Sequence, residues 1–336
     1  MIRKFLFNLV IIVLVVAIVL YFSLKDNFDE IIYHIANMSV WSVILGVLIL
    51  ILYRAIVGLC SYMVVDINKE KVSLFKMIQI NLIIMFFHGI TPFSGGGQPM
   101  EIYYLHSEGV GKTKATNIVL QNFILYQAAL IIVSFLAVIY NNLTGLFPPD
   151  SFMRYLVTLG FVINFLVLLV SFLVSFGKRF NKFILNKGIS FLGKIKIIKD
   201  VDKTKDRFNN FANNFYTNAM LLKEQKGKVC IVLFLNILGL LIYYSIPFVI
   251  AIGMGVTDLN FVSMLVATTY IMMIGSFVPI PGGTGGIEYG FIYFVGYLIS
   301  GGVLTAIMLI WRFITYYFGM VLGALALIFY RKKEKE

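Results

Sequence analysis

The chain has little charge, few histidines and only two cysteines. Charged residues make up 13% of the 336 residues and apolar residues 60%, with a mean hydropathy of +0.91. Soluble domains carry about 25% charged residues, so this composition excludes a soluble globular protein and indicates an integral membrane protein. Cys60 and Cys230 both fall inside predicted membrane spans. We therefore interpret them as buried packing residues, which say nothing about the redox compartment.

Sequence signals for enzymatic chemistry are also missing. The three histidines, His34, His88 and His106, lack the spacing of metal ligands, and no carboxylate cluster accompanies them. The sequence has no Ser/His/Asp nucleophile elbow and no Walker-type phosphate loop. It therefore predicts no catalytic residues, no metal site and no cofactor, and it gives no indication of ATP-driven transport.

Six apolar stretches are long enough to cross about 30 Å of hydrocarbon as helices. The first is too long for the apolar part of a signal peptide, and no small-residue cleavage site follows it. We therefore expect all six to stay in the membrane. The predicted spans are Phe5–Phe22, Trp41–Val65, Asn117–Tyr140, Tyr155–Phe176, Val229–Ile252 and Val303–Tyr330.

Two further apolar stretches are interrupted at their centres by proline and glycine. The interruptions are residues 91–99, with the sequence TPFSGGGQP, and residues 279–286, with the sequence PIPGGTGG. In hydrocarbon, unwound backbone survives only where it is buried in protein or lines a wet cavity. Paired interruptions in the two halves of a membrane protein are a sequence indicator of a substrate site. We therefore predict a site where the two interruptions meet.

Basic residues indicate how the interrupted stretches enter the membrane. The segment 177–228 has 13 Lys or Arg against four acidic residues, so the positive-inside rule places it in the cytoplasm. This requires residues 77–106 to enter the membrane and return to the same side as a re-entrant hairpin. By the same count, residues 261–299 enter from outside and return there. Both chain termini are then cytoplasmic, in a multi-pass protein of the cell membrane.

These elements predict one all-α polytopic membrane domain over residues 1–336. It would have about six full transmembrane helices and two broken re-entrant hairpins in an inverted-repeat arrangement. Residues 5–176 form the first half and residues 229–330 the second. Between them, residues 177–228 form a basic cytoplasmic segment in which phenylalanines recur at helical spacing. We expect an amphipathic helix on the membrane surface there.

Four charged residues lie at membrane depth, where charges are costly and usually functional. Arg54 and Arg312 lie near the centres of their spans, and Glu101 and Glu288 follow the two glycine-rich tips. In one interpretation both arginines face a cavity and bind an anionic head group, because a guanidinium matches a phosphate or carboxylate. In the other, they form structural Arg–Glu ion pairs that hold the hairpins against the long helices. The sequence leaves both interpretations open.

The glycine-rich tips are a second indication of an anion site. Half-helices that start at mid-depth would aim their N-termini, with unsatisfied N–H groups, at the same centre. A tight turn alone would also require the glycines. The tip residues predicted to line the head-group site are Gly95, Gly96, Gly97, Gln98, Gly282, Gly283, Gly285 and Gly286. The supporting positions are Asn81, Pro92, Pro99, Tyr104 and Pro281.

The two interrupted motifs resemble the two signatures of the lysylphosphatidylglycerol synthase transmembrane family. The first signature covers residues 81–105 and the second residues 279–288, with the pair Arg312-Phe313 downstream. The similarity extends over residues 5–330. It implies the flippase-like membrane part that handles aminoacylated phosphatidylglycerol in enzymes whose separate soluble domain uses lysyl-tRNA. Because the chain ends six residues after the last span, we expect a stand-alone member without that domain.

The resemblance implies translocation of (aminoacyl-)phosphatidylglycerol or a similar phospholipid. Arg54 and Arg312 would contact the phosphate, and Glu101 and Glu288 would receive an ammonium group or pair with the arginines between cycles. Many members carry an acid at Gln98 and often a basic residue at Glu101, so the head group stays open. The alternatives are a phosphatidylglycerol lysyltransferase and a secondary transporter of a small anion. Expected partners are phospholipids with anionic head groups, a lipid-modifying enzyme or a second copy of the chain, and nucleic acid only for the lysyl-tRNA alternative.

Overall fold

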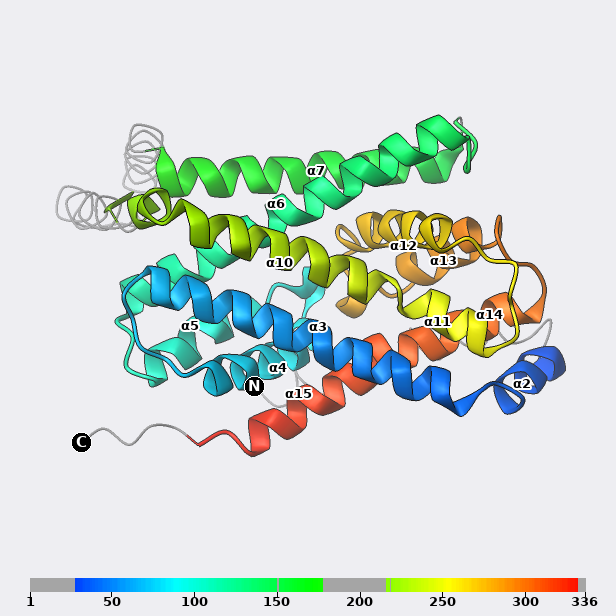
Figure 1. The fold of residues 1–336 in the computed structure, drawn as a ribbon, viewed down its shortest axis with the longest axis horizontal. Coiled ribbons are helices and arrows are strands. Elements are labelled where there is room, and N and C mark those ends of the chain that lie inside the picture. Colours follow the sequence, from blue (N-terminus) through cyan, green and yellow to red (C-terminus); the bar gives the residue numbers. More distant parts are fainter. Residues whose placement is uncertain (1–27, 150, 178–215, 218, 332–336) are drawn as a thin grey trace, which may run out of the picture.

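The computed structural model describes residues 28–149, 151–177, 216–217 and 219–331 of the chain. The predicted span Phe5–Phe22 and nearly all of the predicted amphipathic segment lie outside the described residues. Within the described residues the chain is an all-α membrane protein, as the sequence predicts (Figure 1).

Five helices in the described part of the chain are long and apolar enough to cross a membrane. They confirm five of the six predicted spans. One of them breaks at Ser245, where Pro247 lacks the N–H that would continue the helical hydrogen bonds. Another contains a π-helical segment, Phe313–Phe318. The spans are α3 (Val40–Ile67), α6 (Lys112–Thr144), α7 (Phe152–Phe176), α10 (Lys226–Tyr244) with α11 (Ile246–Gly253), and α14 (Gly302–Arg312) with α15 (Gly319–Ile328).

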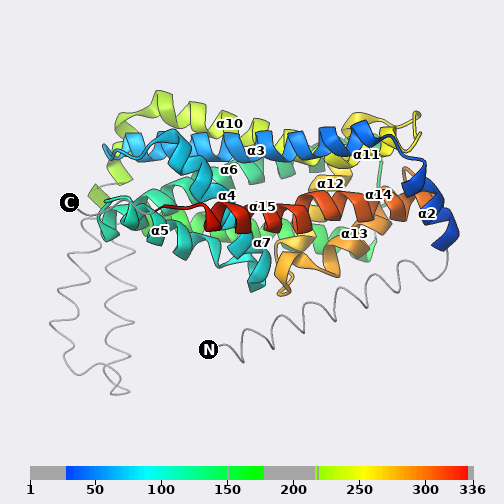
Figure 2. The ribbon, with the colours of Figure 1, turned by 90° about the horizontal axis from the view of Figure 1, so that it is seen from below.

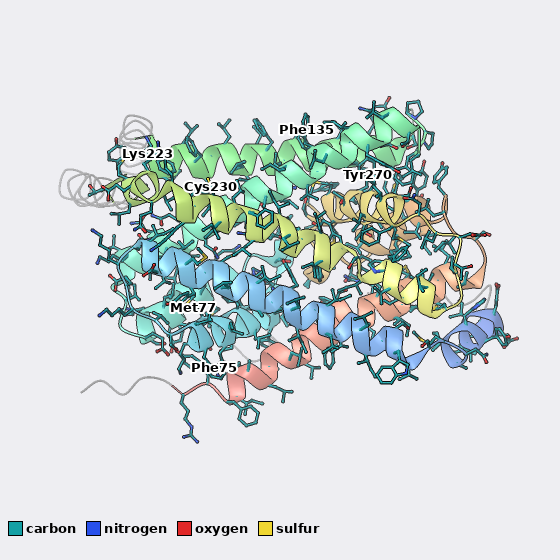
Figure 3. All side chains as sticks on the ribbon, in the orientation of Figure 1. Phe75, Met77, Phe135, Lys223, Cys230 and Tyr270 are labelled. Carbon is teal, nitrogen blue, oxygen red and sulfur yellow. The ribbon has the colours of Figure 1, made fainter. Side chains whose placement is uncertain are left out.

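Large apolar side chains project from the outer sides of these helices (Figure 3). On α3, Leu48 and Leu52 are 55% and 50% exposed, and on α7, Phe165 is 47% exposed. A soluble protein rarely exposes such a continuous apolar surface, whereas lipid chains cover it without cost. Cys230 also lies exposed on α10, while Cys60 is buried. The interpretation of Cys230 as a buried packing residue was therefore wrong, because it lies on an outward side of its helix.

Each interrupted stretch folds as a hairpin of two short helices. The first consists of α4 (Leu74–Ile90), a 3₁₀ turn η1 (Pro92–Ser94) and α5 (Gly97–Ser107). The second consists of α12 (Phe261–Gly275), η2 (Pro281–Gly283) and α13 (Gly286–Val295). The two hairpins occupy opposite halves of the bundle's length (Figure 1). Their tips, η1 and η2, contact each other near the middle and project to the same side (Figure 2).

The two halves of the chain repeat one order of elements in opposite directions. In the first half α3 leads into the hairpin α4–α5 and then into α6. In the second half α10–α11 leads into the hairpin α12–α13 and then into α14–α15. Because the hairpins enter from opposite ends, this is the arrangement of an inverted repeat. A further short helix, α2 (Phe28–Ala36), packs on α14.

Ion pairs gather at one end of the bundle, which we name the basic end. Lys114 Nζ lies 2.5 Å from Glu70 Oε1, and Lys76 Nζ lies 3.4 Å from Glu108 Oε1. A third pair joins Lys228 Nζ and Asp66 Oδ2 at 2.5 Å. The main-chain oxygen of Arg331 also accepts a hydrogen bond from Lys76. The basic loops expected to share one side of the membrane therefore do lie together.

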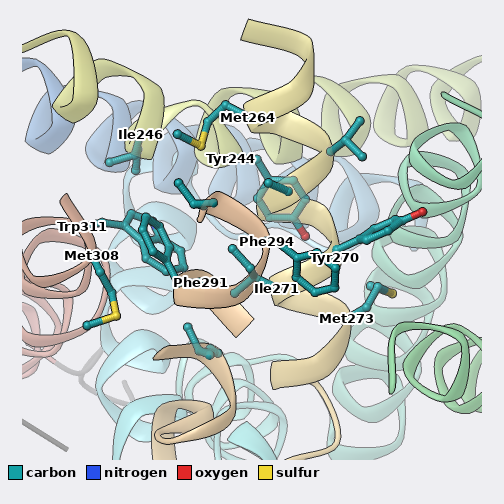
Figure 4. Packing of buried hydrophobic residues seen from close by; sticks show 14 of the residues in the cluster. Tyr244, Ile246, Met264, Tyr270, Ile271, Met273, Phe291, Phe294, Met308 and Trp311 are labelled. Atoms are coloured by element: carbon teal, nitrogen blue, oxygen red, sulfur yellow. The ribbon is translucent and has the colours of Figure 1, made fainter. Parts of the chain in front are cut away.

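Close packing fixes both hairpins to their neighbouring helices. In the second hairpin, the ring of Phe291 on α13 stacks on Trp311 of α14, with ring centroids 5.1 Å apart (Figure 4). In the first, α15 packs against α4 through Gly319 and Gly323. A Cβ at Gly323 would lie 2.6 Å from the main-chain oxygen of Leu82, so only glycine permits this approach.

Candidate functional site

The second hairpin tip is held by an ion pair at the centre of the bundle. Arg312 Nε lies 2.7 Å from Glu288 Oε1, although its N–H does not point along that contact. Arg312 also donates hydrogen bonds to the main-chain oxygen of Gly282 at 3.0 Å and to the hydroxyl of Thr284 at 3.4 Å. Both charged side chains are buried. Arg312 therefore connects α14 directly to the tip.

Glu288 has a second role at the start of α13. It is the third residue of this helix, and its Oε2 accepts the N–H of Gly285 at 2.7 Å. This bond satisfies a donor that helix starts otherwise leave open. As the sequence predicts, α13 begins at Gly286 and points away from the centre. The predicted open N–H at Gly285, however, is occupied by the protein's own carboxylate.

The first tip is held by Thr91, at the end of α4. Its hydroxyl oxygen accepts the N–H of Gly96 at 2.9 Å and donates to the main-chain oxygen of Phe87 at 2.7 Å. The helix α5 begins at Gly97, as predicted. Pro92, Gly95 and Pro99 are exposed, and Gln98 and Gly96 are half-buried.

His88 braces the same tip from inside. Its ring is hydrogen-bonded to the main-chain oxygen of Ser94, and it occupies the space beside Gly97, where a Cβ would lie 2.2 Å from the ring. His88 is therefore a hydrogen-bonded structural residue of the first tip. Phe93 and Ser94 have φ angles of 54° and 52°, in the left-handed region that such residues rarely adopt. Backbone strain of this kind often occurs at ligand sites.

Tyr316 joins the two tips. It lies in the π-helical segment, a geometry that is frequent at functional sites. Its hydroxyl donates to the main-chain oxygen of Gly89 at 2.9 Å, and the Arg312 guanidinium lies 4.7 Å from its ring centroid. Its ring also fills the space at Gly282, where a Cβ would lie 2.2 Å from it. Tyr316 thus contacts the first hairpin, the second hairpin and the central ion pair.

Arg54 is the second arginine at the centre, and it has no acidic partner in the part of the chain that the structure describes. It lies halfway along α3. None of the ion pairs among the described residues includes it, and its buried Nε has no hydrogen-bond partner. Its guanidinium carbon lies 5.1 Å from the ring centroid of Tyr53. Of the two interpretations left open by the sequence, the structural Arg–Glu ion pair therefore does not hold for Arg54 among the described residues.

Tyrosine side chains surround Arg54 and connect it to the second tip. Tyr53 stacks on Tyr243 with ring centroids 4.6 Å apart, and Tyr53 is hydrogen-bonded to Tyr126. Tyr243 lies close enough to both Arg54 and Arg312 to feel their charges. The two arginines therefore converge on one region, as the sequence analysis expects of a head-group site.

Glu101 lies apart from both arginines, among amide and hydroxyl groups. It is buried on α5 and is hydrogen-bonded to Ser61 of α3. Ser61 is seven residues beyond Arg54 on the same helix, about 10 Å along its axis. The supporting residue Asn81 donates to Ser61 Oγ at 3.1 Å. Tyr104, one turn farther on α5, stacks edge-to-face on Tyr330 at the basic end instead of facing the centre.

The sequence of the whole chain assigns this architecture to a family. A family model described as the lysylphosphatidylglycerol synthase TM region matches residues 6–323. The chain belongs to this family. A UPF0104 membrane protein of Archaeoglobus fulgidus is 24% identical over 273 residues, which are 79% of this chain and 79% of that relative. The resemblance inferred from the two interrupted motifs is thereby confirmed.

In this family member, the tyrosines that lie beside the two arginines were not identified from the sequence. Tyr244 and Tyr316 are buried, and Tyr243 lies close enough to both Arg54 and Arg312 to feel their charges. One signal was available for Tyr316. It follows Arg312 by four residues, and residues four apart share one face of a helix.

Proposed function

We propose that this protein moves the head groups of phospholipids across the membrane. The substrate would be (aminoacyl-)phosphatidylglycerol or a similar phospholipid with an anionic phosphate. Membership of the lysylphosphatidylglycerol synthase TM family supports a membrane protein that handles lipids. The exposed first tip, in contact with the half-buried second tip near the middle of the bundle, supports a path for a head group between the hairpins.

The unpaired charge of Arg54 carries the proposal. An unpaired arginine at the centre of a span costs several kcal/mol, and a phosphate would offset this cost with charge-assisted hydrogen bonds. The hydroxyls of Tyr126 and Tyr243 supply further donors beside it. The other central charges, Arg312 and Glu288, largely neutralise each other at 2.7 Å. The charge of Arg54 therefore gives the region a net positive charge, which would attract an anion. Arg312 instead holds the second tip in place.

The activity can be tested with purified protein in liposomes that contain fluorescent phosphatidylglycerol. We expect faster exchange of the lipid between leaflets than in protein-free liposomes, and no lysine incorporation when lysyl-tRNA is added. Lysine incorporation by this chain would instead support a phosphatidylglycerol lysyltransferase. Uptake of a soluble phosphate ester without lipid exchange would support a small-anion transporter. Either result would contradict the proposed function.

The orientation of the bundle is a second expectation. We infer that the basic end faces the cytoplasm of the cell, because positively charged loops stay inside. In a variant without Cys60 and Cys230, single cysteines at the exposed positions Lys112 and Lys226 should be labelled only from the cytoplasmic side. A cysteine at Asn142 should be labelled only from outside. Labelling of the cysteine at position 112 from outside would mean that the first hairpin crosses the membrane.

A further inference from the structure

We propose that Glu101 is a proton-binding site that couples lipid translocation to a proton gradient across the membrane. The coupling to lipid transport rests on the proposed function, whereas the binding of a proton at Glu101 does not.

Glu101 is only 6% exposed, and its Oε1 has no hydrogen-bond partner. No ion pair among the described residues includes it, and no charged side chain there acts on it electrostatically. An isolated buried carboxylate is so costly that it is normally neutralised by a bound cation or by a proton. Glu288, by contrast, already has the Arg312 guanidinium and the Gly285 N–H.

The hydrogen bonds around Ser61 favour the proton over a metal ion. Ser61 Oγ accepts N–H groups from Asn81 at 3.1 Å and from Asn122 at 2.9 Å. Both lone pairs of the hydroxyl are therefore used, and its single proton is left for Glu101. A metal ion of this kind needs several free oxygen ligands. Here the amides of Asn81 and Asn122 direct N–H groups at Ser61, and the Ser61 hydroxyl directs its O–H group at Glu101.

A proton would also supply a donor that the cluster lacks. Asn122 Oδ1 is buried without a partner, although the other end of the same amide is bonded to Ser61. Glu101 Oε1 is another unpartnered acceptor at the same hydroxyl. Two acceptors cannot satisfy each other, whereas a protonated carboxyl is a donor. One proton on Glu101 would therefore remove the charge and provide the missing O–H group.

The other titratable groups near Glu101 do not replace it as the proton carrier. On α3, Asp66 lies about 7.5 Å and Arg54 about 10 Å along the helix axis from Ser61, and Asp66 is paired with Lys228. From α4, His88 is held against Ser94. From α6, the amide of Asn122 reaches Ser61. The remaining titratable groups on these helices and on the chain end beside them are Tyr53, Cys60, Tyr62, Lys76, Tyr103, Tyr104, His106, Lys112, Lys114, Tyr126, Tyr140 and Tyr330.

The position of Glu101 lets its charge act on transport. It lies on the returning arm of the first hairpin, five positions into the helix that starts at the tip. Glu101 would take a proton from water on one side of the membrane and release it to the other side. Each of these steps would change the free-energy cost of burying α5. Because the same hairpin carries His88, which lies close enough to Arg54 to feel its charge, the change would reach the proposed head-group site.

Proton binding can be measured without lipid transport. In infrared spectra of the purified protein, we expect the band of a protonated carboxyl group to appear well above the pH range in which exposed carboxylates titrate, about pH 4. This band should be missing in Glu101→Gln and present in Glu70→Gln, a matched variant at the basic end. Ser61→Ala should keep the band but shift the pH at which it appears, which tests the site even if Glu101→Gln folds poorly. A band unchanged in both Glu101→Gln and Ser61→Ala would overturn the proposal.

Coupling is tested in the same liposomes with an imposed pH gradient. We expect the gradient to change the rate of lipid exchange by wild type and by Glu70→Gln at least threefold, and to leave Glu101→Gln unaffected. Lipid exchange that responds to a sodium gradient but not to the pH gradient would refute proton coupling. If wild type shows the infrared band but moves no lipid under any gradient, the proposed function fails and with it the coupling, while the proton site stands.

Discussion

Replacing Arg312 with alanine should lower the free energy of unfolding by about 3–5 kcal/mol, because it leaves the carboxylate of Glu288 buried without its partner. Glu288 is 8% exposed, so water can compensate little of the lost charge pairing. The variant also loses the two hydrogen bonds from Arg312 to Gly282 and Thr284. The effect can be measured as a fall in the midpoint of thermal unfolding in detergent.

A paired substitution separates charge from packing. In Arg312→Met combined with Glu288→Gln, neither charge remains, and the glutamine oxygen can still accept the N–H of Gly285. We expect this variant to regain most of the stability. As a control, Lys114→Ala removes an exposed partner of Glu70 and should cost less than about 1 kcal/mol. If Arg312→Ala costs no more than this control, the central pair does not hold the second tip.

Replacing Arg54 with glutamine should slow lipid exchange about 10- to 100-fold, which corresponds to the loss of one hydrogen bond from a charged donor. Unlike Arg312→Ala, this substitution should not lower the free energy of unfolding. The buried Nε of Arg54 has no hydrogen-bond partner. Replacing the arginine therefore removes the free-energy cost of burying this charge when no lipid is bound. We therefore expect an unchanged or higher unfolding midpoint together with the loss of exchange, measured on the same preparation.

Two variants sharpen this test. Arg54→Lys keeps the charge but loses the planar fork, so its exchange rate should lie between wild type and Arg54→Gln. Arg154→Gln removes an arginine that bonds to Asn142 at the opposite end of the bundle, and it should exchange lipid at the wild-type rate. Full exchange in Arg54→Gln would show that the head group does not use this arginine.

The architecture could be predicted because it follows from local properties of the sequence. Five spans agree with apolar length, and both hairpins break at their proline and glycine residues. The contact between η1 and η2 was expected for the same reason, since the orientation of each hairpin follows from the distribution of basic residues. The break at Ser245 was missed, because Pro247 alone does not tell a kink from an unbroken membrane helix.

The pairing of charges could not be predicted in the same way. Glu101 and Glu288 both follow a glycine-rich tip, yet only Glu288 meets an arginine. Glu288 is the third residue of α13 and caps it, whereas Glu101 is the fifth residue of α5 and faces Ser61. A shift of two residues rotates a side chain by about 200° around a helix. Spacing therefore left both interpretations of the arginines open until the helix starts were known.

The span formed by α14 and α15 has a mechanical consequence. Through Arg312, its first part is attached to the second hairpin, and through Gly319 and Gly323 its last part is packed against the first hairpin. The π-helical segment Phe313–Phe318 joins these two parts, and its Tyr316 contacts both hairpins. If the two tips separate, this short segment is the hinge on which the two parts must turn, and the bond from Tyr316 to Gly89 is the latch that has to open.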